Sequence, residues 1–178
     1  MDEEEDLLSV QRCLEGDRSA FGEIVDKYQK KMFNVVMRIV NDYDDAEDVT
    51  QAAFVKAYEK LGSFDPKYKF FSWLYRIAVN ESLNLLNQRK NLEGLDESMV
   101  STEKTPEERY NGIEASERVR DALLDLKLDY RTVIVLKHFQ NLSYDEISYI
   151  IGVPEKTVKA RLFTARFQLR EILKKKGL

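Results

Sequence analysis

Half of the residues between positions 64 and 75 are aromatic, and cations are interleaved with them. The aromatic residues are Phe64, Tyr68, Phe70, Phe71, Trp73 and Tyr75, and the cations are Lys67, Lys69 and the adjacent Arg76. Ring faces stack on unpaired bases, while cations hold the phosphates. This composition is typical of a segment that binds single-stranded nucleic acid. A core packed with aromatic residues beside a solvated face is the alternative interpretation.

A stripe of polar side chains follows directly downstream. It consists of Arg76, Asn80, Asn84, Asn87 and Gln88. Intervals of one, three or four residues place these side chains on one face of a helix. Amide side chains can recognise base edges, because they both donate and accept hydrogen bonds. The sequence therefore predicts a helix over residues 71–89 whose polar face extends the single-strand surface.

The C-terminal part of the chain has the spacing of a helix-turn-helix. Ser143 and Glu146 fit a capping box that opens the first helix. The small Ser148 stands four residues before Gly152, and Val158 stands six residues after it. A small residue, a glycine and a branched residue at these spacings allow two helices to cross closely over a tight turn.

The second helix of this pair is predicted to begin at Pro154 and to have two unlike faces. Its inward face carries Val158, Leu162, Ala165 and Leu169. Its outward face carries Lys156, Thr157, Lys159, Ala160, Phe163, Thr164, Phe167 and Arg170. Cations, hydroxyls and apolar groups together suit the phosphates, guanine edges and thymine methyls of a major groove. A helical hairpin without a DNA role is the alternative.

The elements that position these side chains are predicted to be helical throughout. Only seven glycines and three prolines occur in 178 residues, and the apolar residues recur with the helical period. Helices are predicted at residues 7–14, from Asp17 or Ser19 to about 39, and at 45–61, the last opened by a capping box of Asp44 and Glu47. Residues 1–90 are therefore expected to form one compact helical unit.

An acidic segment without periodicity divides the chain. Residues 91–112 are predicted to be a flexible linker, and residues 113–178 a second helical domain. Helices are expected from Thr105 to about Leu126 and over residues 130–140, ahead of the helix-turn-helix. Residues 154–178 contain eight basic and two acidic side chains, whereas the whole chain has a net charge of −4. The cationic C-terminus indicates a polyanionic partner.

Several function classes find no support in the sequence. No apolar run approaches membrane-spanning length, so no membrane insertion is expected. Cys13 is the single cysteine, which excludes an internal disulfide and fits a reducing cytoplasm. His138 is the single histidine, and no glycine-rich phosphate loop or Cys/His metal set accompanies it. The acidic stretch 42–48 lacks the glycine and distal glutamate of an EF-hand. No catalytic residue, metal or cofactor is expected, and hence no enzyme.

Three segments, in this order, resemble the extracytoplasmic-function group of bacterial sigma factors, which keeps regions two and four of the sigma-70 family. Asp44–Tyr58 resembles the polymerase-binding helix, Phe71–Asn80 the promoter-melting helix, and Thr157–Arg166 the minus-thirty-five recognition helix. The resemblance implies an all-α protein with a region 2 bundle and a region 4 helix-turn-helix. It also implies a transcription initiation factor that binds core RNA polymerase, directs it to promoters and promotes strand opening.

The resemblance assigns roles to three sets of residues. The minus-ten set, expected to capture a base flipped from the non-template strand, is Phe64, Lys67, Tyr68, Lys69, Phe70, Phe71, Ser72, Trp73, Arg76, Asn80 and Asn84. The minus-thirty-five set, expected on duplex DNA, is Lys156, Thr157, Lys159, Ala160, Arg161, Phe163, Thr164 and Arg166. The clamp set, expected on the clamp helices of the largest polymerase subunit, is Asp45, Glu47, Asp48, Gln51 and Phe54.

Further partners follow from the same resemblance. Region 4 would contact the flap of the polymerase beta subunit, and an anti-sigma factor would hold the protein inactive. Ala52, Ala160 and Thr164 depart from the residues frequent in the family, so the promoter sequence cannot be transferred from relatives. A stand-alone helix-turn-helix regulator that acts without polymerase is the alternative function.

Overall fold

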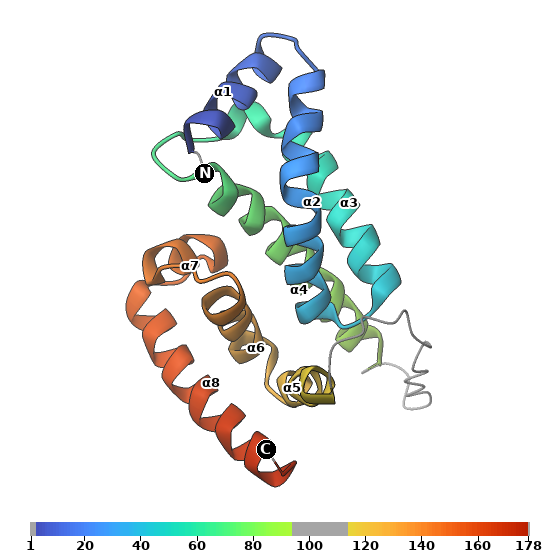
Figure 1. Cartoon of the computed structure of the whole chain (residues 1–178), viewed down its shortest axis with the longest axis vertical. Coiled ribbons are helices and arrows are strands. Elements are labelled where there is room, and N and C mark those ends of the chain that lie inside the picture. The colour runs from blue at the N-terminus through green and yellow to red at the C-terminus, as the bar shows by residue number, and fades with distance from the viewer. Residues whose placement is uncertain (1–2, 94–113, 178) are drawn as a thin grey trace.

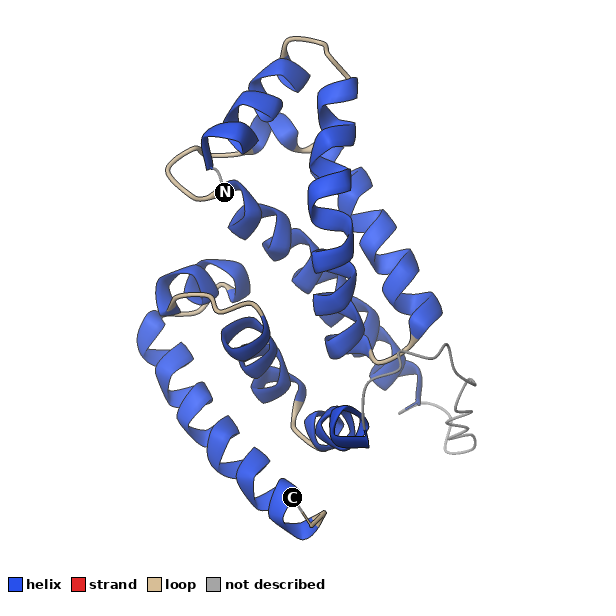
Figure 2. Ribbon diagram, in the orientation of Figure 1, coloured by secondary structure: helices blue, strands red, loops and turns tan. Residues whose placement is uncertain are grey.

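The computed structural model describes residues 3–93 and 114–177, and within these two ranges every regular element is a helix (Figure 2). The all-α prediction is therefore confirmed. The elements are α1 (Glu3–Leu14), α2 (Ser19–Val40), α3 (Tyr43–Glu59), η1 (Leu61–Ser63), α4 (Phe70–Glu93), α5 (Glu114–Leu124), α6 (Leu128–Ile134), η2 (Val135–Phe139), α7 (Tyr144–Ile151) and α8 (Glu155–Lys175).

The helix boundaries differ from the predictions at the end of α4 and within residues 130–140. α4 continues through Glu93, so the first residues of the predicted linker are helical. Most of that linker, and the predicted helix start at Thr105, lie outside the described residues. The predicted helix over residues 130–140 is divided into α6 and the wider π-helical turn η2.

Helix α2 is the central element of the N-terminal half. Its buried side chains include Phe21, Ile24, Tyr28, Met32 and Ile39, whose spacing of three, four and seven residues forms one stripe. α1 is fastened to it by the buried carboxylate of Asp6, which accepts hydrogen bonds from Lys27 Nζ and Tyr28 Oη, each at 2.6 Å. Because Asp6 is paired in this way, its burial is compatible with a stable fold.

The start of α3 corrects one sequence prediction. The N-cap is Asp42, whose backbone is extended and whose carboxylate accepts a hydrogen bond from Asp45 N at 2.9 Å. The predicted capping box of Asp44 and Glu47 is wrong, because the chain is already helical at Tyr43. Both acidic residues remain free to face outward from the helix.

The helix-turn-helix forms as predicted. Ser143 Oγ accepts a hydrogen bond from Glu146 N at 3.1 Å, and Glu146 Oε2 accepts one from Ser143 N at 2.8 Å, which completes the capping box. Gly152 ends α7 with a φ of 68°, a conformation that other residues rarely adopt. Ser148 Oγ also donates a hydrogen bond to the carbonyl of Val153 at 2.6 Å. The Ser148 side chain therefore stabilises the turn in addition to allowing the two helices to approach closely.

The two halves of the chain pack directly on each other. α7 lies against α4, η2 and α6 lie against α2, and the buried side chains of both halves form one continuous cluster (Figure 1). α8 lies on the far side of the C-terminal half, against α5, α6 and α7. The fold therefore leaves α8 exposed along its outer face, while α7 lies between α8 and helix α4 of the N-terminal half.

Candidate nucleic-acid interfaces

The minus-thirty-five set lies on α8, and most of it forms an exposed ridge. The inward residues Val158, Leu162 and Ala165 are buried, as the spacing predicted. The exposed members of the set are Lys156, Lys159, Ala160, Phe163 and Arg166, whereas Thr157, Arg161 and Thr164 are half-buried. A single helix thus presents cations and apolar groups on one side, which is the arrangement that major-groove recognition requires.

Phe163 is the most exposed large apolar side chain on this ridge. Its relative exposure is 77%, and that of Phe167, one turn later, is 63%. A solvent-exposed phenyl ring contributes little to the free energy of folding, since its apolar surface is not removed from water. Such a ring at the centre of a cationic helix face indicates an intermolecular contact.

Arg161 differs from the rest of the minus-thirty-five set. Its guanidinium lies 2.9 Å from the carboxylate of Asp129 on α6. This ion pair directs the side chain toward the body of the C-terminal half. In this conformation Arg161 fastens α8 to α6 and is turned away from the exposed ridge.

His138 accepts a hydrogen bond from Arg166 at the base of the ridge. The Nε atom of Arg166 lies 3.1 Å from the Nε2 atom of His138. Burial lowers the pKa of His138, and the charges of Arg166 and Lys137 lower it further. Only the neutral imidazole can accept this bond.

We expect this contact to weaken as the pH falls. Since the folded pKa lies below the ordinary value of 6.5, the unfolded chain binds the proton first, and stability decreases as the pH drops through that value. An NMR titration of His138 measures the shift. Substitution Arg166→Gln should raise the pKa of His138 toward 6.5, and an ordinary pKa in the unsubstituted protein would contradict the arrangement.

The minus-ten set is divided by burial into three groups. Lys67, Lys69, Arg76, Asn80 and Asn84 are exposed. Phe64, Tyr68 and Phe71 are half-buried, and Phe70, Ser72 and Trp73 are buried. The segment therefore contains an aromatic core beside an exposed polar face, which is the arrangement that the alternative interpretation described. Its binding to single strands stays a prediction.

The buried aromatic residues form a cluster beneath the loop that precedes α4. The ring centroids of Phe64 and Phe70 lie 5.3 Å apart, and those of Phe64 and Trp73 lie 5.5 Å apart. The Phe64–Phe70 pair is edge-to-face, and such packing stabilises the cluster beyond the burial of its area. Phe70 and Trp73 therefore support the loop from below, and Phe64 lies at its half-exposed edge.

The cations of the loop already have partners within the protein. Lys67 Nζ lies 3.0 Å from the carboxylate of Asp65. Lys69 Nζ lies 2.7 Å from Glu146 on α7, and this hydrogen bond raises the pKa of Lys69. The Arg76 guanidinium carbon lies 4.9 Å from the ring centre of Tyr149, also on α7. A DNA phosphate that binds one of these cations would have to displace the contact that the cation makes within the protein.

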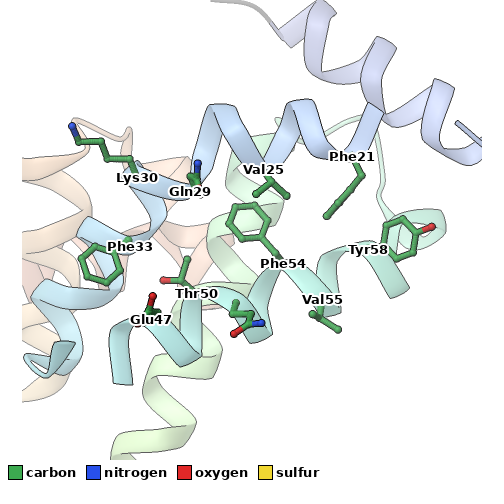
Figure 3. A pocket seen from close by; sticks show the side chains of 11 residues that line it. Phe21, Val25, Gln29, Lys30, Phe33, Glu47, Thr50, Phe54, Val55 and Tyr58 are labelled. Carbon is green, nitrogen blue, oxygen red and sulfur yellow. The ribbon is translucent and has the colours of Figure 1, made fainter. Parts of the chain in front are cut away.

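The clamp set lies on α3 and is divided between two sides of that helix. Glu47, Gln51 and Phe54 line an apolar groove of about 690 Å³ between α2 and α3 (Figure 3). Asp45 and Asp48 instead line a smaller hollow of about 240 Å³ beside α4. Asp45 accepts a hydrogen bond from Arg89 at 2.6 Å and is thereby engaged within the protein.

Eight of the eleven residues that line the larger groove were not assigned to it by the sequence prediction, among them Val55 and Tyr58. Val55 and Tyr58 are 53% and 41% exposed on α3 and line the groove together with Phe54 (Figure 3). Thr50 lies at its floor, and its hydroxyl oxygen finds no hydrogen-bond partner among the described residues. The sequence did contain a signal for this surface, because Val55 and Tyr58 are apolar residues that lie outside the buried stripe of α3.

Two kinds of site are absent from the described ranges. In residues 3–93 and 114–177, no three His, Cys, Asp or Glu side chains gather closely enough to hold a metal ion. None of the helices in this part of the chain has the length and apolar character needed to cross a membrane.

Known protein families and curated relatives match both halves of the chain. The family model for sigma-70 region 2 matches residues 24–91, and that for sigma-70 region 4 matches residues 116–169. The ECF RNA polymerase sigma factor SigW of Bacillus subtilis is 36% identical over 93% of this chain and 95% of its own length. The ECF RNA polymerase sigma-E factor of Escherichia coli K12 is 36% identical over 90% of both chains.

Solved structures are similar over both halves as well. CnrH, in complex with the cytosolic domain of CnrY, has a TM-score of 0.73 at 26% identity and matches over 96% of this chain and 97% of its own. The sigma factor RpoE of Bartonella quintana, in complex with the anti-sigma factor NepR, has a TM-score of 0.74 at 25% identity. That match covers 86% of this chain and 96% of RpoE.

Proposed function

Because this chain belongs to the extracytoplasmic-function sigma factors of the sigma-70 family, which are transcription initiation factors, we propose that its two halves divide promoter recognition between them. Residues 1–90 act as region 2, which binds core polymerase and melts the minus-ten element. Residues 91–112 act as the linker, and residues 113–178 act as region 4, which binds the minus-thirty-five element. The supporting observation is that one chain presents a cationic, apolar ridge on α8 and an open apolar groove between α2 and α3.

The minus-ten set would capture an unpaired base of the non-template strand. Its exposed amides, Asn80 and Asn84, lie along α4 next to Arg76. Extruding a base costs a few kcal/mol of lost stacking, which ring stacking and contacts to the base edge must return. Phe64, Tyr68 and Phe71 are the half-buried rings of the set, and the buried cluster supports Phe64 from beneath.

The exposed ridge of α8 would lie in the major groove of the minus-thirty-five element. We expect Phe163→Ala to reduce promoter-specific transcription about tenfold, because an apolar contact to DNA is lost. The free energy of unfolding should change by less than about 0.5 kcal/mol, since the ring is exposed. Run-off transcription and thermal melting measure the two effects. Leu8→Ala is the matched control, because Leu8 is an exposed apolar residue on α1, away from the ridge. Equal activity of the two variants would contradict the assignment.

The groove between α2 and α3 would receive the clamp helices of the largest polymerase subunit. Apolar lining with a polar rim is the usual composition of a protein interface. Glu47, Gln51 and Phe54 of the clamp set lie there, together with Val55 and Tyr58. In the same holoenzyme, region 4 would contact the flap of the beta subunit.

The remaining assignments follow from this role. A stand-alone regulator is not supported, because relatives matched over most of the chain are polymerase sigma factors. We propose that the chain has no catalytic activity of its own and acts in the cytoplasm, where transcription takes place. We further propose an anti-sigma factor as a partner, because the similar RpoE structure is a complex with the anti-sigma factor NepR.

Run-off transcription with purified core polymerase tests the proposal. Core enzyme with this chain should start transcripts at specific sites, and permanganate should detect unpaired thymines near those sites. Core enzyme alone is the control. Tight duplex binding by the free chain without any polymerase-dependent transcript would favour the stand-alone regulator and overturn the proposal.

A further inference from the structure

His138 lies on the π-helical turn η2, and the residues on both sides of it are held in place. Lys137 Nζ donates a hydrogen bond to the carbonyl of Leu142 at 2.8 Å. The guanidinium carbon of Arg38 lies 4.5 Å from the ring centre of Phe139. π-Helical turns are rare and are frequent at functional sites. His138 is therefore an exposed side chain on a well-anchored stretch of backbone.

The imidazole of His138 holds Arg166 by a single atom of the guanidinium group. The Nε atom of Arg166 lies 3.1 Å from the Nε2 atom of His138. A neutral imidazole that accepts at Nε2 carries its hydrogen on Nδ1. A guanidinium has five N–H groups, and this bond uses the one on Nε. The four N–H groups on Nη1 and Nη2 are therefore left for another partner.

The partner of Arg166 differs in charge from the partners of two other cations on α8. Lys159 pairs with the carboxylate of Glu155, and Arg161 pairs with that of Asp129. A carboxylate offsets the charge of its cation and so weakens the attraction of that cation to DNA. A neutral imidazole fixes the direction of the side chain and leaves its positive charge in place. Arg166 is thus both oriented and fully charged.

The position of Arg166 along α8 indicates which part of the duplex it meets. It stands eleven residues after Glu155, the first residue of the helix, which corresponds to about 16 Å along the axis. In a helix-turn-helix, the first residues of the recognition helix contact the base edges. A residue three turns later lies where the helix leaves the groove and meets the sugar–phosphate backbone. The two terminal nitrogens of a guanidinium match two oxygens of one phosphate.

We propose that His138 is a positioning residue for DNA binding, which holds Arg166 so that Nη1 and Nη2 make a forked contact with one phosphate of the minus-thirty-five duplex. This inference rests on the function proposed for the ridge of α8. A side chain that is already held loses less rotamer freedom on binding, and this smaller loss raises the affinity. Because a phosphate carries no sequence information, the contribution should be the same for every base sequence.

A double-mutant cycle on DNA binding tests the positioning role. The holoenzyme of each variant is titrated at about pH 8, where His138 is neutral, with a fluorescein-labelled promoter duplex mapped by run-off transcription with the unsubstituted chain. His138→Leu should weaken binding about three- to fivefold, as expected for the loss of one hydrogen bond. Once Arg166 has been replaced by glutamine, His138→Leu should have no further effect, because the side chain that it positions is gone.

Two further variants separate positioning from a general structural effect. His138→Gln keeps a neutral acceptor, since its amide oxygen accepts hydrogen bonds, and should restore most of the affinity that His138→Leu loses. Lys156→Gln is the matched control for the cycle, because Lys156 is another exposed cation of the ridge. His138→Leu should weaken binding by the same factor whether or not Lys156 is present. Thermal melting confirms that each variant is folded.

The dependence of binding on salt identifies the group that Arg166 contacts. Arg166→Gln should reduce the slope of log affinity against log salt by about 1, equally for duplexes whose minus-thirty-five base pairs are changed one at a time. Loss of preference for one base pair at an unchanged slope means contact with a base edge and overturns the proposal.

The remaining outcomes separate this inference from the function on which it rests. Additive losses from His138→Leu and Arg166→Gln overturn the positioning role, and so does failure of His138→Gln to restore binding. Neither result affects the assignment of the ridge to duplex DNA. If Phe163→Ala transcribes normally, the ridge is not the duplex interface, and the positioning role fails with it.

Discussion

Replacing Asn80 by alanine is expected to lower promoter opening by roughly one to two orders of magnitude, while binding to core polymerase is retained. An amide that pairs with a base edge contributes about 1–3 kcal/mol to recognition, and this energy offsets the loss of base stacking. Asn80 is exposed on α4, so its truncation leaves no cavity in the fold. Permanganate footprinting of the holoenzyme on a promoter measures the effect.

A second asparagine on the same helix provides the control. Asn87 is also exposed on α4, about 10 Å further along the axis, and lies outside the minus-ten set. Asn87→Ala should open promoters as the unsubstituted protein does. Equal loss of opening by both variants would mean that α4 contributes through the polarity of its whole exposed face and that Asn80 makes no specific contact to a base.

Replacing Val55 by aspartate is expected to weaken binding to core polymerase about a hundredfold or more. The side chain lies in the apolar groove between α2 and α3 and is 53% exposed (Figure 3). A carboxylate enclosed at an interface without a partner costs about 3–5 kcal/mol, and each 1.4 kcal/mol corresponds to a factor of ten. Surface-immobilised core polymerase titrated with the variant measures the affinity.

The folded chain itself should tolerate this change, because position 55 is open to solvent before the complex forms. Leu8→Asp is the matched control. Leu8 is a similarly exposed apolar residue, at 58%, but lies on α1 outside the groove. Unchanged affinity of Val55→Asp for the polymerase would exclude this groove as the clamp interface.

The prediction was most accurate where local chemistry decides structure. The capping box of Ser143 and Glu146 and the tight turn at Gly152 formed as predicted, and three of the four inward residues predicted for α8 are buried, Leu169 being half-buried. Each depends on interactions within a few residues, which the sequence displays directly. The cap of α3 was wrong because Asp42, Asp44 and Asp45 are all chemically able to cap, and the path of the chain out of α2 selected Asp42.

Residue spacing alone does not tell which aromatic side chains of residues 64–75 are buried and which are exposed. Phe64, Phe70 and Trp73 belong to one run, yet Phe70 is wholly buried and Phe64 is half-exposed. Which ring turns inward depends on how the loop meets α2 and α4. The same limit applies to Arg161, which lies among the predicted duplex contacts but pairs with Asp129 on another helix.

By itself, the sequence determined the helical architecture, the family and the residue types that each surface offers, because periodicity, capping and motif spacing are local properties of a chain. Only the tertiary structure decided that Tyr149 stacks on Tyr68, that Glu146 pairs with Lys69, and that Val55 completes a groove. The partners in these contacts lie on different helices, up to 81 residues apart in the case of the two tyrosines. Their meeting depends on how the helices pack, which no short-range pattern encodes.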